Sequence, residues 1–218
     1  MAFENRAEAG RLLAGRLDSY RGRHPLVLAI PRGAVPMGKI VADALAGELD
    51  IVLVRKLRAP YNPELAIGSI DETGAVYLDP DMHDLWEESY LKAEKKTQLA
   101  TLRQRRHQYE PAGAPTDAAG RIAIVLDDGI ATGSTMIAAL RAVRARHPAK
   151  LIAATAVASA AALRLIHQEA DEVVCLETPA FLAAIGYHFR DFSQVSDEEV
   201  VATLREAKRP HVPIGAKT

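Results

Sequence analysis

The chain has 218 residues, of which 49% are hydrophobic and 25% are charged, and its formal net charge is −1. This balance is typical of a globular protein with a sizeable core, and it gives no overall attraction for nucleic acid or for a membrane surface. The single cysteine, Cys175, excludes a disulfide within the chain, and its apolar neighbours indicate a buried thiol rather than a nucleophile. Because there is no apolar run of membrane-spanning length and no secretory leader core at the N-terminus, we expect a cytoplasmic protein.

The first part of the chain predicts helices that alternate with a buried strand. Residues 4–20 carry apolar side chains near helical spacing, residues 25–30 are a wholly apolar strand, and residues 35–46 predict a helix. Arg32 and Gly33 lie in the turn after the strand, at the sheet edge where open α/β sheets bind ligands. A glycine lets a ligand approach the backbone closely, and an arginine offers a cationic guanidinium with several N–H donors. Both properties suit a pyrophosphate. The alternative is a tight turn with an exposed arginine.

Two cations and a proline-containing segment follow the next strand. Arg55 and Lys56 end the predicted strand that begins at Asp50 and is apolar over residues 51–54. There they would either neutralise a polyanion at the same sheet edge or extend into water. Residues 57–64 contain two prolines, which cannot continue a strand ladder, and so they predict a mobile loop. The side chains of this loop that could reach into the site are Arg58, Tyr61 and Glu64.

The middle of the chain predicts a hairpin and then a long helix. Residues 65–70 and 75–78 predict the two strands of this hairpin, and residues 71–74 predict its turn. Residues 81–109 predict a helix that could contribute to contact between two copies of the chain. A basic helix can bind nucleic acid, but the near-neutral total charge favours a solvated face. Its cations are Lys92, Lys95, Lys96, Arg103, Arg105 and Arg106.

The most informative stretch joins a buried strand at residues 121–126 to a helix through Asp127, Asp128 and a loop of small residues. A strand, a small-residue loop and a helix N-terminus together surround an anion with backbone N–H groups, and a phosphate is the natural ligand. The two carboxylates would repel a phosphate but can accept hydrogen bonds from the vicinal hydroxyls of a ribose. A ribose 5-phosphate is therefore the minimal ligand. The predicted phosphate loop is Gly129, Ile130, Ala131, Thr132, Gly133, Ser134 and Thr135.

The last third predicts two further strands, at residues 150–157 and 172–176, with a helix at 160–169 between them. Apolar strands that alternate with helices give a parallel sheet with right-handed crossovers. Residues 178–192 then bring four aromatic side chains together in one short segment. Ser196 and Glu199 form the pattern of a helix capping box.

The strand, the acidic pair and the following Thr-Gly-Ser-Thr resemble the signature of the type I phosphoribosyltransferases, which bind 5-phosphoribosyl 1-pyrophosphate (PRPP). The whole chain resembles the small stand-alone bacterial members of that family, whose acceptors are unassigned. The resemblance implies an α/β fold with a twisted parallel sheet of about five strands flanked by helices, a small hood, and an inserted hairpin plus long helix. It implies one domain over residues 1–218, with a core at 25–195, a helical insertion at 81–109, and a hood formed by 178–195 and the N-terminal segment.

The same resemblance implies PRPP and a nitrogen acceptor as substrates, pyrophosphate as product, and Mg²⁺ carried in with PRPP. Asp127 and Asp128 would serve the ribose hydroxyls near the metal. The pyrophosphate would bind Arg32, Gly33, Arg55 and Lys56. The flexible loop would close over the site and exclude water, which matters because hydrolysis competes with transfer. An acceptor hood would consist of Phe181, Tyr187, Asp191 and Phe192, unless these aromatic residues only pack the last strand onto the core.

One departure from the family pattern concerns the acceptor. The 6-oxopurine enzymes carry an acidic residue where this chain has Ala131, and alanine cannot accept a proton from a base. This disfavours hypoxanthine and guanine without establishing adenine. Two other functions stay open on the sequence alone: a non-catalytic regulator that senses PRPP, and a Mg²⁺-dependent hydrolase that acts on a sugar phosphate.

Overall fold

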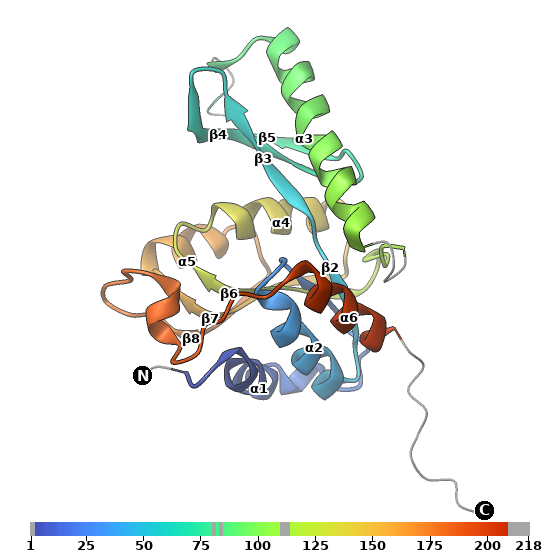
Figure 1. Ribbon diagram of the computed structural model, residues 1–218, viewed down its shortest axis with the longest axis vertical. Helices are drawn as coiled ribbons and strands as arrows, with labels where there is room; N and C mark the ends of the chain where they lie inside the picture. The colour runs from blue at the N-terminus through green and yellow to red at the C-terminus, as the bar shows by residue number, and fades with distance from the viewer. Residues whose placement is uncertain (1–2, 80–81, 83–84, 110–113, 209–218) are drawn as a thin grey trace, which may run out of the picture.

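The computed structural model describes residues 3–79, 82, 85–109 and 114–208, without the side chains of Pro63 and Glu64. Its centre is a five-stranded sheet in the order β2-β1-β6-β7-β8, in which every neighbouring pair is parallel (Figure 1). This confirms the predicted parallel α/β sheet. The strands are β1 (Leu26–Ala29), β2 (Glu48–Ile51), β6 (Ile122–Ile130), β7 (Lys150–Ala158) and β8 (Glu172–Glu177).

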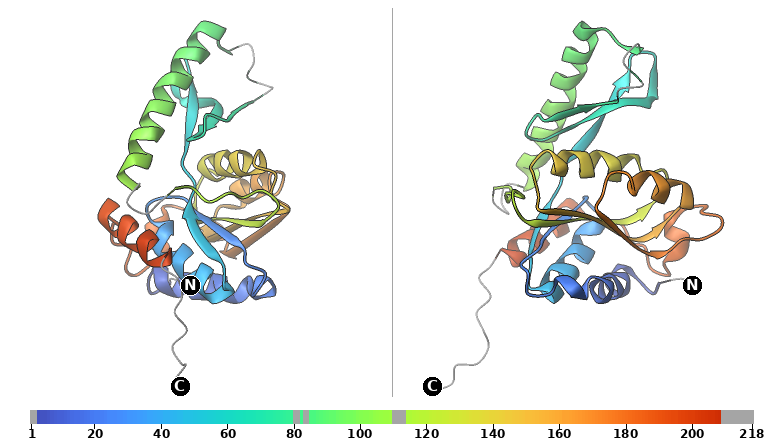
Figure 2. Two further views of the ribbon diagram at one scale, coloured as in Figure 1. Left: turned by 90° about the vertical axis from the view of Figure 1, so that its right-hand side faces the viewer. Right: turned by 180° about the vertical axis from the view of Figure 1, so that it is seen from behind.

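Helices cover both faces of this sheet. One face carries α1 (Arg6–Arg16), α2 (Ala34–Leu45) and α6 (Asp197–Ala207), and the other carries α4 (Ser134–Arg144) and α5 (Ala160–Ile166) (Figures 1 and 2). Successive strand residues point to opposite faces. Val27 therefore packs into the core beneath α1 and α2, whereas Leu28 packs into the core beneath α4 and α5. Burial on both faces explains why the strands are apolar throughout.

The strand order reverses between β1 and β6. From β1 the sheet continues to β2 on one side, with Ala29 opposite Ile51, and to β6 on the other, with Ala29 opposite Leu126. The loops that follow β1 and β6 therefore leave the sheet side by side at its carboxyl edge. This switch point is the place where open α/β sheets bind ligands.

A second, antiparallel sheet and the long helix rise away from the central sheet, as all three ribbon views show (Figures 1 and 2). They comprise β3 (Val54–Ala59), β4 (Asn62–Asp71), β5 (Val76–Leu78) and α3 (Glu88–Tyr109), which we call the arm. The predicted hairpin of β4 and β5 is confirmed, with Ser69 opposite Tyr77. The sheet of the arm rests on α4, where the Arg141 guanidinium lies 3.7 Å from the centroid of the Tyr77 ring.

Two sequence predictions for the arm are wrong. Arg55 and Lys56 lie inside β3, not at the end of a parallel strand, because the apolar run of residues 51–54 begins in β2 and ends in a strand of the other sheet. Residues 57–64 do not form the predicted loop: β3 and β4 form a tight hairpin in which Ala59 pairs with Asn62. Pro60 occupies the turn, and Pro63 lies at the start of β4, where the pairing register with β3 shifts.

The long helix begins at Glu88, later than predicted, and it ends at Tyr109 as expected. Residues 81, 83 and 84 of that predicted helix lie outside the described residues.

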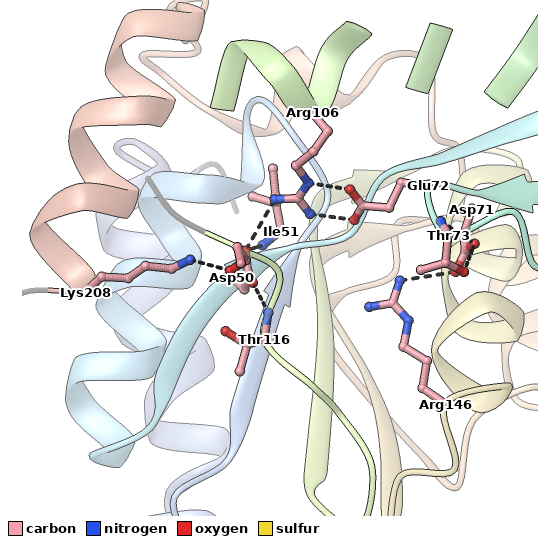
Figure 3. A network of polar contacts seen from close by, with 10 residues as sticks. Asp50, Ile51, Asp71, Glu72, Thr73, Arg106, Thr116, Arg146 and Lys208 are labelled. Atoms are coloured by element: carbon pink, nitrogen blue, oxygen red, sulfur yellow. Dashed lines mark hydrogen bonds and ion pairs between the residues drawn. The ribbon is translucent and has the colours of Figure 1, made fainter. Parts of the chain in front are cut away.

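Buried ion pairs fix the base of the arm to the central sheet (Figure 3). Arg106, near the end of α3, pairs through Nε and Nη2 with both carboxylate oxygens of Glu72, just after β4. Its Nη1 lies 3.8 Å from Asp50 Oδ1 in β2, and the Asp50 side chain is 2% exposed. Asp50 also accepts hydrogen bonds from the backbone N–H groups of Ile51 and Thr116. One arginine thus joins both sheets.

Two smaller predictions concern single residues. The capping box of Ser196 and Glu199 is present at the start of α6. Cys175 is only partly buried, but it packs against the core beneath α4 and α5, and burial raises the pKa of its thiol. In the described part of the chain, no helix has the length and apolar character that crossing a membrane requires.

Candidate functional site

A cleft of about 540 Å³ opens at the carboxyl ends of β1 and β6. Five distant parts of the chain line it. The loop after β1 contributes Arg32 and Gly33, and β6 contributes Asp128. Its remaining wall includes Arg6 of α1, Arg105 of α3 and Phe192 from the segment after β8. The switch point of the sheet is therefore a concave site with both charges and an aromatic face.

Gly33 brings the two loops into contact. A Cβ atom at Gly33 would lie 2.1 Å from Asp128 Oδ2 and 3.0 Å from Arg6 Nη2, so a side chain there would displace the carboxylate. The backbone of Gly33 is helical, with φ −56°, and any residue can adopt it. The glycine is therefore needed for the close approach of Asp128 rather than for the turn. The preceding Pro31–Arg32 peptide bond is cis.

The two adjacent carboxylates have different surroundings. Asp128 lines the cleft and accepts a hydrogen bond of 2.8 Å from Arg6 Nε. Asp127 Oδ1 accepts the backbone N–H of Asp128 at 2.9 Å. Burial, and then the negative charge of Asp128, hold the pKa of Asp127 well above its usual value. Of the predicted pair, Asp128 is the carboxylate that faces the cleft.

The predicted phosphate loop is shorter in the structure than the sequence indicated. Pairing with β7 extends β6 through the acidic pair to Ile130, so residues 131–133 alone connect it to α4. Gly133 has φ +84°, a left-handed conformation that favours glycine, and α4 begins at the next residue. The first N–H groups of a helix have no partner within the helix and can bind an anion. Ser159 Oγ supports the loop by donating a hydrogen bond of 2.7 Å to the Ala131 carbonyl. The Thr132 and Ser134 hydroxyls lie 3.2 Å apart, and Thr135 is exposed.

Two residues of this loop belong to the core rather than to the exposed surface. Ile130 is buried beneath α4 and α5. Gly129 is covered by Ile185, because a Cβ atom at Gly129 would lie 2.2 Å from Ile185 Cγ2. Ile185 begins the short 3₁₀ helix η4 (Ile185–His188) and also lines the cleft. The first two residues of the predicted loop are therefore packed, Ile130 against the core and Gly129 against Ile185.

The four residues predicted for pyrophosphate binding do not come together. Arg32 lines the cleft with Gly33, and its Nη1 lies 3.4 Å from Asp197 Oδ2 at the start of α6. Lys56 instead lines a separate cavity of about 120 Å³ against α4, beside Ser134. Arg55 donates a hydrogen bond of 2.8 Å to Gln98 of α3. Arg55 and Lys56 lie away from the cleft because both belong to β3 in the sheet of the arm.

The residues predicted to close over the site lie at the far hairpin of the arm. Tyr61 is 98% exposed, and the backbone N–H of Arg58 donates to Glu94 of α3 at 3.2 Å. Neither residue lines the cleft. The side chain of Glu64 lies outside the described part of the chain.

The predicted acceptor hood is divided. Phe192 lines the cleft and stacks on the buried Phe189, with ring centroids 4.9 Å apart. Phe181 and Tyr187 are exposed by 83% and 79%. Asp191 is exposed, and hydrogen bonds from the Ser193 hydroxyl and backbone N–H lower its pKa. Phe192 is the aromatic residue of this set that the structure brings to the cleft.

Sequence reasoning missed Arg6, which contacts both Asp128 and Phe192. Its side chain lies 3.8 Å from the centroid of the Phe192 ring. The spacing of residues 4–20 predicts only an amphipathic helix, and the contact with Asp128 joins positions 122 apart in the chain. No local pattern carries that information.

A family model for the phosphoribosyl transferase domain matches residues 3–191 of the chain. The chain belongs to the phosphoribosyl transferase family. The resemblance drawn from the acidic motif is thereby confirmed. Asp128 of that motif lines one cleft together with the turn at Gly33.

Two relatives of this family member match it over most of its length. A Mycobacterium tuberculosis (strain CDC 1551) protein named "Putative phosphoribosyl transferase" is 40% identical over 216 residues, which are 98% of this chain and 49% of that protein. The chain therefore spans about half the length of this curated relative. The crystal structure of TT1426 from Thermus thermophilus has 41% identity and a TM-score of 0.89, covering 94% of this chain and 99% of that one.

Proposed function

We propose that this member of the phosphoribosyl transferase family binds Mg²⁺–PRPP in the cleft between β1 and β6. It would transfer the phosphoribosyl group to a nitrogen acceptor and release pyrophosphate. The observation that carries this proposal is the contact between Gly33 and Asp128, which places a candidate pyrophosphate loop against a candidate ribose carboxylate. PRPP has a phosphate group at one end and a pyrophosphate at the other, so two loops on neighbouring strands suit it better than one loop alone.

The roles follow from the chemistry of each group. The first turn of α4 would hold the 5-phosphate through backbone N–H groups and the hydroxyls of the loop. Asp128 would accept hydrogen bonds from the ribose hydroxyls, and Arg32 would bind the pyrophosphate. Negative charge grows on pyrophosphate as the bond to the anomeric carbon breaks. A fixed cation and loop N–H groups aimed at that charge would stabilise the transition state.

Mg²⁺ fits the donors of this cleft. It binds through one or two carboxylates plus substrate phosphates and keeps several waters, and Asp128 offers a carboxylate beside the pyrophosphate loop. The ion would neutralise the leaving group when PRPP is bound.

The acceptor would enter beside Phe192, which presents an aromatic face in the cleft. A flat heterocycle can stack on such a ring. Because Phe181 and Tyr187 are exposed, Phe192 is the residue of the predicted hood that we assign to the acceptor.

The test is release of pyrophosphate from Mg²⁺–PRPP against a panel of purine and pyrimidine bases and small amines. Release that depends on one acceptor would support the proposal and identify the substrate. Release in the absence of any acceptor would indicate a hydrolase. No release, together with a salt-sensitive complex with RNA or DNA, would favour a regulator that uses the basic surface of α3.

A further inference from the structure

Arg6 has contacts that the other arginines of α1, Arg11 and Arg16, do not share in the described structure, since both are exposed. Its Nε donates to Asp128 Oδ2 at 2.8 Å, and the two side chains are 13% and 14% exposed. Its Nη1 donates to the Ser193 carbonyl at 2.7 Å. The guanidinium also covers the Phe192 ring. Arg6 therefore links the acidic motif to the hood from a third part of the chain.

The backbone fixes the place of Arg6. The segment before α1 pairs with the hood: Phe3 N–H donates to the His188 carbonyl at 2.7 Å, and Arg190 N–H donates to the Phe3 carbonyl at 2.8 Å. Asn5 then caps α1 by accepting the Glu8 N–H at 3.1 Å. Arg6 is the first residue of the helix after this cap. Its side chain thus starts from a position that two sets of hydrogen bonds define.

The positive charge of Arg6 would reduce the repulsion between Asp128 and the phosphate groups of a ligand in the cleft. A carboxylate that binds ribose must lie beside the phosphate groups of the same ligand, and like charges repel. A guanidinium 2.8 Å from Asp128 Oδ2 offsets the negative charge of that carboxylate. An ionised carboxylate accepts several hydrogen bonds, so Asp128 can accept one from Arg6 and another from a ribose hydroxyl.

We propose that Arg6 is a positioning residue, which orients Asp128 toward the ribose hydroxyls of PRPP and offsets its charge in the presence of the phosphates. This inference rests on the proposed function. It differs from a role in phosphate binding, in which Arg6 would contact the pyrophosphate itself. The two roles predict different effects on two fragments of PRPP: ribose 5-phosphate carries the sugar hydroxyls, and Mg²⁺–pyrophosphate carries none.

The experiment measures dissociation constants of Mg²⁺–PRPP, ribose 5-phosphate and Mg²⁺–pyrophosphate by titration calorimetry. The variants are Arg6→Gln, Arg6→Lys and the matched control Arg11→Gln on the same helix. Arg6→Gln should weaken PRPP and ribose 5-phosphate about tenfold or more, because a charge-assisted hydrogen bond no longer orients Asp128. Binding of Mg²⁺–pyrophosphate should weaken less, because it loses only the charge compensation of Asp128 and has no ribose hydroxyls for that carboxylate to bind. Arg6→Lys should restore part of the lost affinity, and Arg11→Gln should match the unmodified protein.

Several results would overturn the inference. Equal weakening of Mg²⁺–pyrophosphate would assign Arg6 to direct phosphate binding, and unchanged affinities in Arg6→Gln would remove it from the site. If Arg6→Gln does not fold, Arg6→Lys carries the same test, since it keeps the charge but lacks the planar fork that holds Asp128 and Ser193 together. Failure of the unmodified protein to bind Mg²⁺–PRPP would refute the proposed function itself, which separates that outcome from a failure of the Arg6 assignment.

Discussion

Replacing Gly33 with alanine tests whether the contact between the two loops is required. Alanine is compatible with the helical φ of −56° at this position, so the substitution introduces no backbone strain. The new methyl group would lie 2.1 Å from Asp128 Oδ2, far inside the ordinary contact distance. The carboxylate must therefore move, and it would lose its hydrogen bond from Arg6 Nε.

Two separate effects should follow. Overpacking of this kind costs about 1–3 kcal/mol of folding stability. A displaced Asp128 carboxylate would also lose its charge-assisted hydrogen bond to a ribose hydroxyl, which costs about 1.5–3 kcal/mol of binding energy, or roughly 10- to 150-fold in affinity for PRPP. Gly33→Ala should therefore fold, unfold at a lower urea concentration, and release pyrophosphate far more slowly at limiting PRPP.

The matched control is Gly15→Ala in α1, where a Cβ atom would have nothing within 4 Å. Alanine in a helix interior stabilises by about 0.5–1 kcal/mol relative to glycine, so this control should gain stability and keep its activity. The assays are urea denaturation and the dependence of pyrophosphate release on PRPP concentration. Ordinary kinetics in Gly33→Ala would show that Asp128 does not act from the position seen here.

Three further predictions concern the ion pairs, the acidic pair and the hood. Arg106→Met should lower the free energy of unfolding in urea by about 3–5 kcal/mol, because two nearly buried carboxylates lose their partner, whereas Arg103→Met on the exposed face of α3 should change it little. Burial raises the pKa of Asp127 in the folded state above its ordinary value of 3.8. Below pH 3.8 the carboxyl is neutral in both the folded and the unfolded chain, and the free energy of unfolding then falls as the pH rises through the raised pKa. Asp127→Asn should therefore be more stable than the unmodified protein in urea at pH 7, and the advantage should vanish at low pH; equal stability at pH 7 would contradict this. Phe192→Ala should slow transfer, because it removes a contact with the Arg6 guanidinium worth about 0.5–2 kcal/mol. Phe181→Ala should not slow it, and equal effects of the two variants would show that Phe192 does not belong to the site.

The elements that bear local signals could be predicted from the sequence. The apolar strands and the capping box at Ser196 each depend on neighbouring residues, and the structure has them where the sequence indicated. The acidic pair was expected after its strand, but β6 continues through it to Ile130, because pairing with β7 extends the strand and no local signal reveals that pairing. Arg55 and Lys56 were misplaced because the apolar run around Val52 does not reveal that the chain passes from one sheet to another there.

The rest of the site depends on contacts between distant residues. Arg6 reaches Asp128 only because the N-terminal segment pairs with residues 188–191, and no spacing in the sequence indicates that pairing. The aromatic cluster had no periodicity that could separate the cleft residue Phe192 from the exposed Phe181 and Tyr187. Tertiary structure therefore decides which members of each predicted set share the cleft.

The most direct test of the central claim is calorimetric titration of the protein and of Asp128→Asn with Mg²⁺–PRPP. Asparagine keeps the shape of the side chain but loses its charge and its pairing with Arg6. We predict binding of one PRPP per chain, weakened about tenfold or more in Asp128→Asn, which corresponds to about 1.4 kcal/mol per factor of ten. Absence of binding, or equal affinity in the two proteins, would contradict the assignment of this cleft to PRPP.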